Sequence, residues 1–535
     1  MIRLAFCSLL WLPALVGLGT LWGHRLPRAV AAPVLGLLGL TTLAAAGMVV
    51  NLVLPVSPWL AAATCAGGWA LLALRARRLE LRPPWPELAA VAVLALLVAW
   101  LTPPAWEHYD TGLYHLQAVK WAVQARALPG LSLVHHRFGT TLAWPPACAL
   151  LELPFVGEGG SAAFATALPL VLGAWAAIAA ARAARDARDL FLAGAFALLP
   201  FAGVATFHDL GGLGNDLLVA TMEGLCLALW ARAFAVPEER GRLAPAAMHV
   251  ATFALVVKLT AGAIFAGSAL LLAWSWRILP RAARWKLAGP ALLVALWLVR
   301  GFLSSGCLVF SVTSTCLDVP WAVPAAVIED ASRWNRAWAR LPNTDPALVL
   351  GRWDWLRSWL PMMASTPWVQ LSAAALVAGL VVAAVRRTRP TAALLVPWGL
   401  SLAAVAFWFA TAPALRFGAA PLLAAGLLPL AFALAGPLAV ARLPWRVGAA
   451  VLALALLTWL PRPWLALWAE TRSLPPQALV APVPPYRLET AAGGLELAVP
   501  LQGDQCWDAP LPCTPSPDAR LEWEGRWFAL RPPSR

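Results

Sequence analysis

The sequence predicts an all-α polytopic membrane protein with about 14 transmembrane helices and a small external C-terminal cap. Three observations lead to this fold class. First, 61% of the 535 residues are apolar and only 12% are charged, whereas soluble domains are roughly half apolar and a quarter charged. Second, the apolar residues form runs long enough to cross a bilayer. Third, arginine clusters separate these runs. This composition excludes a soluble enzyme, a disordered chain and a small disulfide-rich secreted domain.

About 20 apolar residues cross a bilayer, and fewer suffice where the flanks adapt. The predicted spans are the mostly apolar runs that meet this length. In chain order the runs are 4–22, 29–50, 57–74, 87–101, 161–181, 190–206, 217–236, 243–258, 260–276, 287–303, 368–385, 391–410, 417–440 and 446–461. A basic flank with Arg25 and Arg28 follows the first run, where a signal peptide would carry a small-residue cleavage site. The first run is therefore predicted to be a retained helix.

Arginine clusters predict the orientation of the spans. The formal net charge is +14, and the arginines gather at 75–82, 182–188, 240–242, 277–286, 386–389 and 442–446. Successive clusters enclose an even number of spans, so all of them can face the cytoplasm, and the N-terminus then lies outside. The positive charge is thus explained by topology, and we expect the lipid bilayer and no nucleic acid as a partner.

The segments left outside include two that are too large to be simple turns. Loop 305–367 is rich in tryptophan and predicts a helix over 325–340 at the headgroup level. The Pro-rich tail carries short alternating runs at 495–499 and 521–530, which predict strands and turns. The predicted domains are accessory transmembrane helices at 1–86, a transmembrane core at 87–461 with external loops 102–142 and 305–367, and an external tail domain at 462–535.

The eight cysteines divide by location. Four lie in or near spans and are expected to be buried thiols: Cys7, Cys65, Cys148 and Cys226. The pairs Cys307/Cys316 and Cys506/Cys513 lie in outside segments, where an oxidising compartment favours a disulfide within each pair. A zinc site fits less well, because neither pair has a matching second pair of Cys or His.

The densest polar segment directly follows span 87–101. It carries two carboxylates and two imidazoles: Glu107, His108, Asp110 and His115. A helix is predicted over 112–126, with His115 and Lys120 on it as candidate substrate- or phosphate-binding residues. Two interpretations of Asp110 are open, an N-cap of this helix or a general base or metal-anchoring carboxylate at the mouth of a membrane-embedded cavity. Glu107 and His108 are candidate catalytic residues or solvated turn residues.

Two further outside segments carry candidate substrate-binding residues. His208, Asp209 and Asp216 surround a glycine-rich turn, which is either an ordinary turn with Asp216 as N-cap or part of a binding site that faces Asp110. Lys258 lies at a span boundary, where it either snorkels outward or supplies a cation for an anionic substrate. Arg416 is a lone outside arginine at the entry to a span, so it is a candidate for bidentate phosphate binding, with interfacial snorkelling as the alternative.

These residues resemble polyprenol-dependent glycosyltransferases of the GT-C superfold, and the chain is similar in more detail to a bacterial multi-pass family associated with that superfold. The matching stretches are 109–115, 412–418 and 506–513. The resemblance implies that Asp110 is the catalytic carboxylate and that Arg416 binds the phosphate of a polyprenyl-phosphate sugar donor. It also implies hexosyl or pentosyl transfer to a cell-envelope glycan or lipid acceptor, on the periplasmic face of a bacterial inner membrane.

The chain departs from the superfold in two ways. Three extra spans precede span 87–101, and loop 102–142 has no Asp-Glu or Asp-x-Asp pair. A divalent metal, held by Asp110 and Asp209, is therefore an open question, and no other cofactor is expected. Two other classes of function are open: a polytopic transporter or lipid-linked glycan flippase, and a non-enzymatic envelope-assembly protein. The one-sided distribution of polar sites favours the enzyme.

Overall fold

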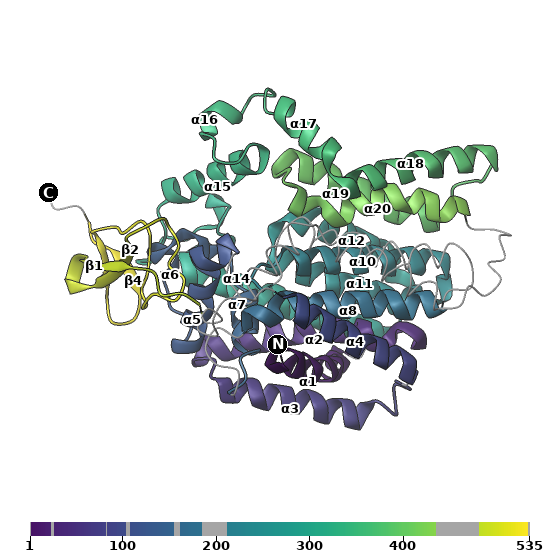
Figure 1. Ribbon diagram of the computed structural model, residues 1–535, viewed down its shortest axis with the longest axis horizontal. Coiled ribbons are helices and arrows are strands. Elements are labelled where there is room, and N and C mark those ends of the chain that lie inside the picture. Colours follow the sequence, from purple (N-terminus) through teal and green to yellow (C-terminus); the bar gives the residue numbers. More distant parts are fainter. Residues whose placement is uncertain are drawn as a thin grey trace.

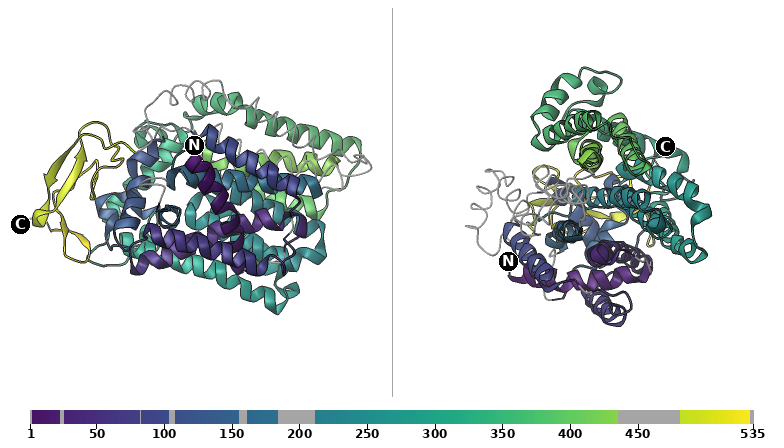
Figure 2. Two further views of the ribbon diagram at one scale, coloured as in Figure 1. Left: turned by 60° about the horizontal axis from the view of Figure 1, so that its bottom comes forward. Right: turned by 90° about the vertical axis from the view of Figure 1, so that its right-hand side faces the viewer.

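The computed structural model of the protein describes residues 2–22, 26–81, 83–102, 108–154, 161–183, 211–434 and 481–532. Within these residues the chain is mostly helical, and strands occur only in the C-terminal segment. The long helices lie side by side with their axes in roughly one direction (Figure 1; Figure 2). The coarse prediction of a helical membrane protein with a small C-terminal region of strands is confirmed.

Each predicted span within the described residues corresponds, in whole or in part, to a helix. These helices are α1 (Ile2–Gly19), α2 (Ala31–Val53), α3 (Pro58–Arg75), α4 (Trp85–Leu101), α8 (Ser161–Ala183), α10 (Asp216–Ala235), α11 (Pro237–Val257), α12 (Gly262–Ser275), α14 (Ala288–Ser305), α18 (Pro367–Val385), α19 (Ala392–Thr411) and α20 (Leu415–Leu434). The predicted spans 190–206 and 446–461 lie outside the described residues. In the described part, eight helical segments are long and apolar enough to cross a membrane, so the predicted number of about 14 spans is not confirmed.

Glycines allow α1 to pack closely against α2 and α3. A Cβ atom on Gly17 would lie 1.8 Å from the carbonyl oxygen of Gly68 in α3, and one on Gly39 of α2 would lie 2.0 Å from the carbonyl oxygen of Leu15. Small residues that let helix backbones approach are typical of helix packing in membranes. The side chains of these first helices share one continuous apolar core with α8, α10 and α11.

The two ends of the helical bundle carry different segments. At one end, which we call the loop end, lie segment 108–142, segment 306–366 and the strands of the tail (Figure 1, left). At the opposite end, which we call the arginine end, lie the connections 76–84 and 386–391 (Figure 1, right). This grouping agrees with the predicted separation of outside loops from arginine clusters. Which end faces the cytoplasm stays a prediction.

A buried ion pair joins α4 to α8 at the arginine end. The Glu87 carboxylate in α4 is almost fully buried and accepts hydrogen bonds from Trp175 Nε1 and Arg182 Nε of α8, both at 2.7 Å. Arg75, at the end of α3, donates to the carbonyl oxygen of Thr20 at 2.7 Å. Arg182 thus joins the ends of α4 and α8, and Arg75 joins the end of α3 to the turn after α1.

The tail forms two small antiparallel strand pairs at the loop end. Strand β1 (Tyr486–Thr490) pairs with β2 (Glu496–Pro500), and β3 (Leu521–Trp523) pairs with β4 (Phe528–Leu530). The predicted runs 495–499 and 521–530 correspond to β2 and to β3 with β4. The side chains of Leu497, Leu521 and Phe528 pack on Val134 and Phe138 from segment 108–142. The tail is thus anchored on the loops below it by an apolar core.

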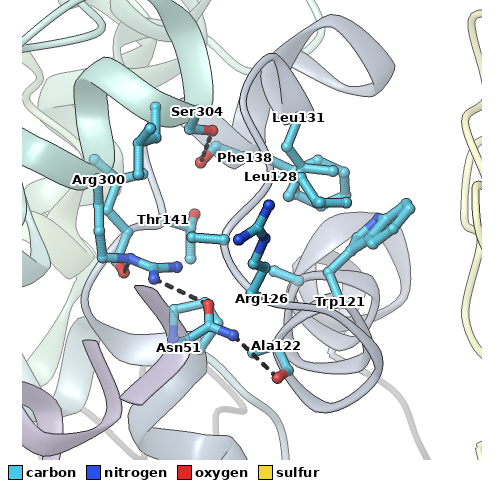
Figure 3. A pocket seen from close by; sticks show the side chains of 15 residues that line it. Asn51, Trp121, Ala122, Arg126, Leu128, Leu131, Phe138, Thr141, Arg300 and Ser304 are labelled. Carbon is cyan, nitrogen blue, oxygen red and sulfur yellow. Dashed lines mark hydrogen bonds between the residues drawn. The ribbon is translucent and has the colours of Figure 1, made fainter. Parts of the chain in front are cut away.

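Shorter helices complete the loop end. They are η3 (Thr111–His115), α5 (Leu116–Gln124), α6 (Leu131–Val134), η4 (His136–Gly139), α7 (Trp144–Ala149), α15 (Ala325–Arg340), α16 (Pro346–Val349) and α17 (Leu356–Ser365). Helix α15 has the predicted bounds 325–340. Disulfides join Cys307 to Cys316 and Cys506 to Cys513. The other four cysteines are buried free thiols. A pocket of about 40 Å³ lies between α5, α14 and the end of α2 (Figure 3).

Candidate functional site

Asp110 stands at the start of the helical segment that crosses the loop end. The first turn is a π-helical turn, η3, and its N-terminal hydrogen bond is made by His108, whose Nδ1 accepts from the Thr111 N–H at 3.1 Å. The Thr111 hydroxyl oxygen in turn accepts from the N–H of Leu213, just before α10, at 2.9 Å. Asp110 makes no capping hydrogen bond with its side chain. Asp110 thus holds the N-cap position of η3 without the side-chain hydrogen bond that the N-cap interpretation predicts.

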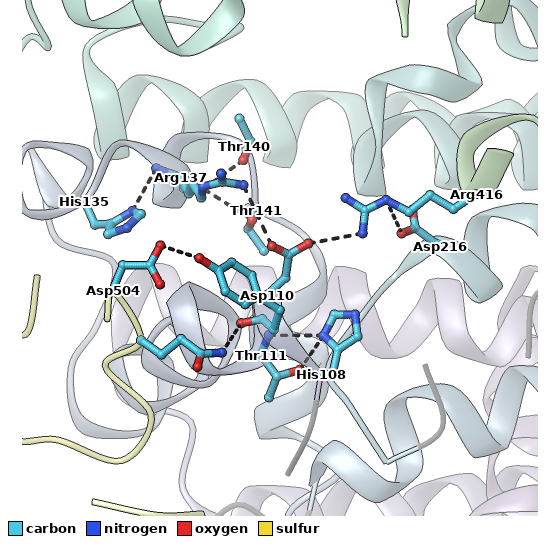
Figure 4. Close-up of polar contacts among 12 residues, drawn as sticks. His108, Asp110, Thr111, His135, Arg137, Thr140, Thr141, Asp216, Arg416 and Asp504 are labelled. Carbon is cyan, nitrogen blue, oxygen red and sulfur yellow. Dashed lines mark hydrogen bonds and ion pairs between the residues drawn. The ribbon is translucent and has the colours of Figure 1, made fainter. Parts of the chain in front are cut away.

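The Asp110 carboxylate lies between two guanidinium groups from distant parts of the chain (Figure 4). Its Oδ2 is 3.5 Å from Arg416 Nη1, and its Oδ1 is 4.0 Å from Arg137 Nη1. Arg416 also faces a second carboxylate, with 3.7 Å between its Nε and Asp216 Oδ2. Asp216 Oδ1 forms an ion pair with Lys258 Nζ. We call these five residues the Asp110 cluster.

The Asp110 cluster carries one more positive charge than negative. It holds two carboxylates and three cations, all of them buried or half-buried at the loop end. His108 and His115 lie beside it, and burial lowers the pKa of His115 to about 3, so this imidazole is neutral at physiological pH. An excess cation in a partly desolvated site favours the binding of an anion.

Aromatic rings hold the cations of the cluster in place. The Arg416 guanidinium lies 4.6 Å from the ring centre of Trp338 in α15, and Lys258 Nζ lies 4.0 Å from that of Phe417. The Arg137 guanidinium lies 5.4 Å from the ring of Tyr114. Cation–π contacts of this kind stabilise a guanidinium or ammonium group while leaving its N–H donors available. Residues 305–367 thus reach the site through Trp338.

Opposing effects set the ionisation of Asp110. Burial disfavours the charged carboxylate, but the positive charges around it, first that of Arg416 and also that of Arg137, outweigh burial, so the pKa of Asp110 lies below its ordinary value. Asp110 is consequently ionised at neutral pH. The neighbouring Tyr109 behaves oppositely, because burial and its hydrogen bond to Asp504 raise its pKa to about 12.

The C-terminal tail covers the first turn of this segment. The N–H of Trp507 donates to the carbonyl oxygen of Gly112 at 2.8 Å, and a Cβ atom on Gly112 would lie 2.4 Å from the Trp507 ring. Only glycine therefore fits under this ring without a shift. Tyr109 donates through its hydroxyl group to Asp504 Oδ2 at 2.5 Å. Stretch 109–115 thus contacts 412–418 through Asp110 and Arg416, and 506–513 through Gly112 and Trp507.

The other predicted site residues have different positions. Lys120 faces the tail instead of the Asp110 cluster, since its Nζ lies 2.8 Å from Asp508 Oδ1 and donates to the carbonyl oxygens of Asp508 and Ala509. Asp216 is the first residue of α10 and Asn215 is its N-cap, so the predicted N-cap role of Asp216 is wrong. Lys258 points to Asp216 and does not snorkel away. Glu107, His208 and Asp209 lie outside the described residues.

No group of three or more His, Cys, Asp or Glu side chains lies close enough together to hold a metal ion, as far as the described residues extend. Asp110 contributes one carboxylate, and its predicted partner Asp209 lies outside those residues. A metal role for Asp110 stays a prediction.

Sequence reasoning left two members of the site out of its assignments. Arg137 follows His135 and His136, and this basic run was open to interpretation as a plain interfacial patch. Trp338 was one of many tryptophans in 305–367, and nothing in its spacing singles it out. The signal that points to Arg416, a lone outside arginine in a chain whose arginines cluster on the other side, does not extend to Arg137, which stands in a basic run.

A family model described as "Domain of unknown function (DUF8201)" matches residues 1–423. This is more than half of the chain, so the chain belongs to that family. The match includes Asp110, Arg137, Asp216, Lys258 and Arg416, and it ends before the tail strands. No curated protein and no solved structure matches the chain.

Proposed function

We propose that this DUF8201 family member is a membrane glycosyltransferase that transfers a sugar from a polyprenyl-phosphate donor to a cell-envelope glycan or lipid acceptor. The observation that carries the proposal is the Asp110 carboxylate between the guanidinium groups of Arg416 and Arg137 at the loop end. A glycosyl transfer of this type needs one proton acceptor and several cations within a few ångströms of each other. The resemblance of 109–115 and 412–418 to the GT-C superfold supports the same assignment.

In the proposed reaction the acceptor hydroxyl oxygen attacks the anomeric carbon of the donor sugar. The new bond joins the acceptor oxygen to that carbon, the bond from the carbon to the phosphate oxygen breaks, and the lipid phosphate leaves with the electron pair. The Asp110 carboxylate takes the acceptor proton. Arg416 and Arg137 stabilise the negative charge that grows on the phosphate, because guanidinium groups bind phosphate through two parallel hydrogen bonds.

The long distances in the Asp110 cluster would let Arg416 and Arg137 leave Asp110 and bind the donor phosphate. At 3.5 and 4.0 Å the arginines lie near Asp110 but form no short bidentate pair with it. A donor phosphate that draws both arginines away would remove the charges that lower the pKa of Asp110. The carboxylate would then become a stronger base when the donor is bound. Asp216 keeps Lys258 and Arg416 within reach in both states.

The test compares glycan profiles of a deletion strain that carries either the wild-type gene or single variants. Asp110→Asn keeps the shape of the side chain and removes the base, so we expect the product glycan to be lost while the protein stays at normal levels in the membrane. Asp354→Asn, at an exposed carboxylate of the loop end, is the matched control and should restore the glycan.

Two outcomes would overturn the proposal. A normal glycan with Asp110→Asn would remove the catalytic role and favour an assembly protein. Accumulation of a complete lipid-linked glycan on the cytoplasmic side would favour a flippase. Loss of a single sugar from the glycan would support the transferase.

A further inference from the structure

A second cationic site lies in the pocket between α5, α14 and the C-terminal end of α2. Apolar side chains form one side of this pocket, and polar groups form the other (Figure 3). The apolar side includes Trp121, Leu128 and Leu131. The polar residues are Asn51, Arg126, Thr141, Arg300 and Ser304. None of these residues belongs to the Asp110 cluster.

Arg300 brings a charge into a helix that is apolar enough to span the membrane. It lies on α14 near the loop end, where an ionisable residue is costly and usually functional. Its Nε donates to the carbonyl oxygen of Leu142 at 2.8 Å, and its Nη1 donates to Asn51 Oδ1 at 2.9 Å. Both acceptors are neutral. These bonds fix the guanidinium group but leave its charge without compensation.

Arg126 adds a second charge to the same pocket. The guanidinium groups of Arg126 and Arg300 both line the pocket, and Figure 3 shows Thr141 between them. No Asp or Glu is among the residues that line the pocket in the described part of the chain. Two cations in one pocket without a carboxylate repel each other, and an anion between them removes the repulsion.

The carbonyl groups at the neighbouring helix end are partly compensated by Asn51. The C-terminal carbonyl groups of a helix carry partial negative charge, and α5 ends beside the pocket. The Asn51 side-chain amide donates to the carbonyl oxygens of Ala122 at 3.1 Å and Ala125 at 2.9 Å. Asn51 thus satisfies these carbonyl groups and holds Arg300 with its other oxygen.

The size and the walls of the pocket define the class of ligand. The volume of about 40 Å³ holds a few water molecules, at roughly 10–15 Å³ each, and so admits one small anionic group. Guanidinium groups bind phosphate in a bidentate way, and the hydroxyl groups of Thr141 and Ser304 supply further polar contacts. Trp121, Leu128 and Leu131 offer an apolar surface beside the anion, which suits the chain of a lipid.

We propose that the Arg126–Arg300 pocket binds the phosphate group of a lipid headgroup or a free phosphate ion. The inference does not rest on the proposed glycosyltransferase activity, since it uses other residues. It adds a phosphate-binding site to the loop end, where η4 contributes Phe138 to the pocket and Arg137 to the Asp110 cluster.

The test measures ligand retention by the purified full-length protein. The protein is reconstituted in phosphatidylcholine with or without phosphatidylglycerol, extracted, and examined by native mass spectrometry. We expect wild-type protein to retain phosphatidylglycerol, and Arg300→Gln and Arg126→Gln to retain about tenfold less, since each variant loses a charge-assisted hydrogen bond to the phosphate group. In a parallel measurement, inorganic phosphate should raise the melting temperature of wild-type protein only if the pocket binds the free ion.

Three variants keep the result interpretable. Arg126 is exposed and forms no hydrogen bond to another described residue, so Arg126→Gln should fold even if Arg300→Gln does not. Arg333→Gln removes an equal charge from the exposed face of α15 and should retain lipid like the wild type. Asp110→Asn should also retain it, which separates this site from the proposed activity. Lipid retention and phosphate stabilisation that are equal in Arg126→Gln and wild type would overturn the inference.

Discussion

Two ion pairs at opposite ends of the bundle show what separates a structural contact from a candidate catalytic one. At the arginine end, Glu87 accepts two hydrogen bonds of 2.7 Å, and its side chain is 2% exposed. At the loop end, Asp110 has no contact shorter than 3.5 Å to either arginine, and its side chain is 17% exposed. Each Glu87 oxygen therefore accepts a short hydrogen bond. The Asp110 oxygens hold their arginines more loosely, as expected if the arginines bind the proposed substrate.

The charge around each carboxylate differs as well. Glu87 faces one arginine and one neutral indole, so its pair closes α4 against α8. Asp110 and Asp216 share three cations, which leaves one positive charge in excess. A balanced, short pair stabilises a fold. An unbalanced, longer one carries charge that suits the proposed anionic substrate.

The largest effect is expected from removing the base. Asp110→Asn should lower kcat by about 10³-fold, because general base catalysis contributes 10²- to 10⁴-fold. The melting temperature of the protein should fall only slightly, by the stability that ionised Asp110 contributes at neutral pH. Sugar transfer from a radiolabelled lipid-phosphate donor by purified protein would measure the rate. If Asp110→Asn kept more than a tenth of the wild-type rate, Asp110 would have a structural role like that of Glu87 and not a catalytic one.

A smaller loss is expected from Arg416. Arg416→Gln should lower kcat/KM by about 10- to 100-fold, the value of one charge-assisted contact of about 1.5–3 kcal/mol. Arg416→Lys should recover part of this loss, since lysine keeps the charge but not the bidentate geometry. Arg333→Gln, on the exposed face of α15, is the control. Equal rates for Arg416→Gln and wild type would show that Arg416 only balances the charge of Asp110.

At the arginine end we expect a substitution to lower stability and to leave activity unchanged. Glu87→Gln keeps a group of similar shape but weakens the bonds to Arg182 and Trp175, so the free energy of unfolding should fall by about 1–2 kcal/mol. Arg182 is partly exposed, and water limits the loss. Thermal unfolding in detergent would measure it. Activity per folded molecule should not change; a large fall in kcat would contradict the structural role of Glu87.

The smallest expected effect is a difference between two pH profiles. Because the pKa of Asp110 lies below its ordinary value in the free protein, kcat/KM should not decline until the pH falls below about 4. A bound donor phosphate that draws the arginines away raises this pKa, so kcat should decline at a higher pH than kcat/KM. His115, with a pKa of about 3, adds no transition near pH 6.5. Coinciding profiles would argue against partner exchange.

The sign of the stability effect follows from the same lowered pKa. Ionised Asp110 contributes stability above its ordinary pKa, and this contribution is lost as the pH falls through the lowered folded value. Unfolding experiments between pH 3 and 7 should therefore show a shallower acid dependence in Asp110→Asn than in wild type.

Most of the fold could be predicted from the sequence, because membrane helices are recognisable from the length of their apolar runs and from the charged residues beside them. The rhythm of 325–340 gave its bounds, and alternation in 495–499 indicated strand β2. Strand β1 was missed, since four of its five residues are exposed and it carries no apolar alternation. The number of spans was less certain: short runs such as 87–101 are helices, but length and composition alone do not establish that they cross the membrane.

The candidate site was predicted in part. Asp110 and Arg416 were chosen as rare outside charges, and the structure brings them together with Asp216 and Lys258. Arg300 was hidden inside the apolar run 287–303, where a search for average hydrophobicity passes over a single charge. Its partner Arg126 lies 174 positions earlier, and no local pattern can reveal that the two guanidinium groups face one pocket. Such pairings depend on tertiary packing.

The contact between Trp507 and Gly112 has a consequence for the order in which the site is completed. Gly112 belongs to a segment made early in synthesis, and Trp507 to one made after all the described helices. Because the two are in contact, the tail must reach the same side of the membrane as Asp110. Until it does, the helical turn that holds Gly112 lacks the Trp507 ring that packs over it. The ribosome thus finishes the described helices before it makes the segment that covers this turn.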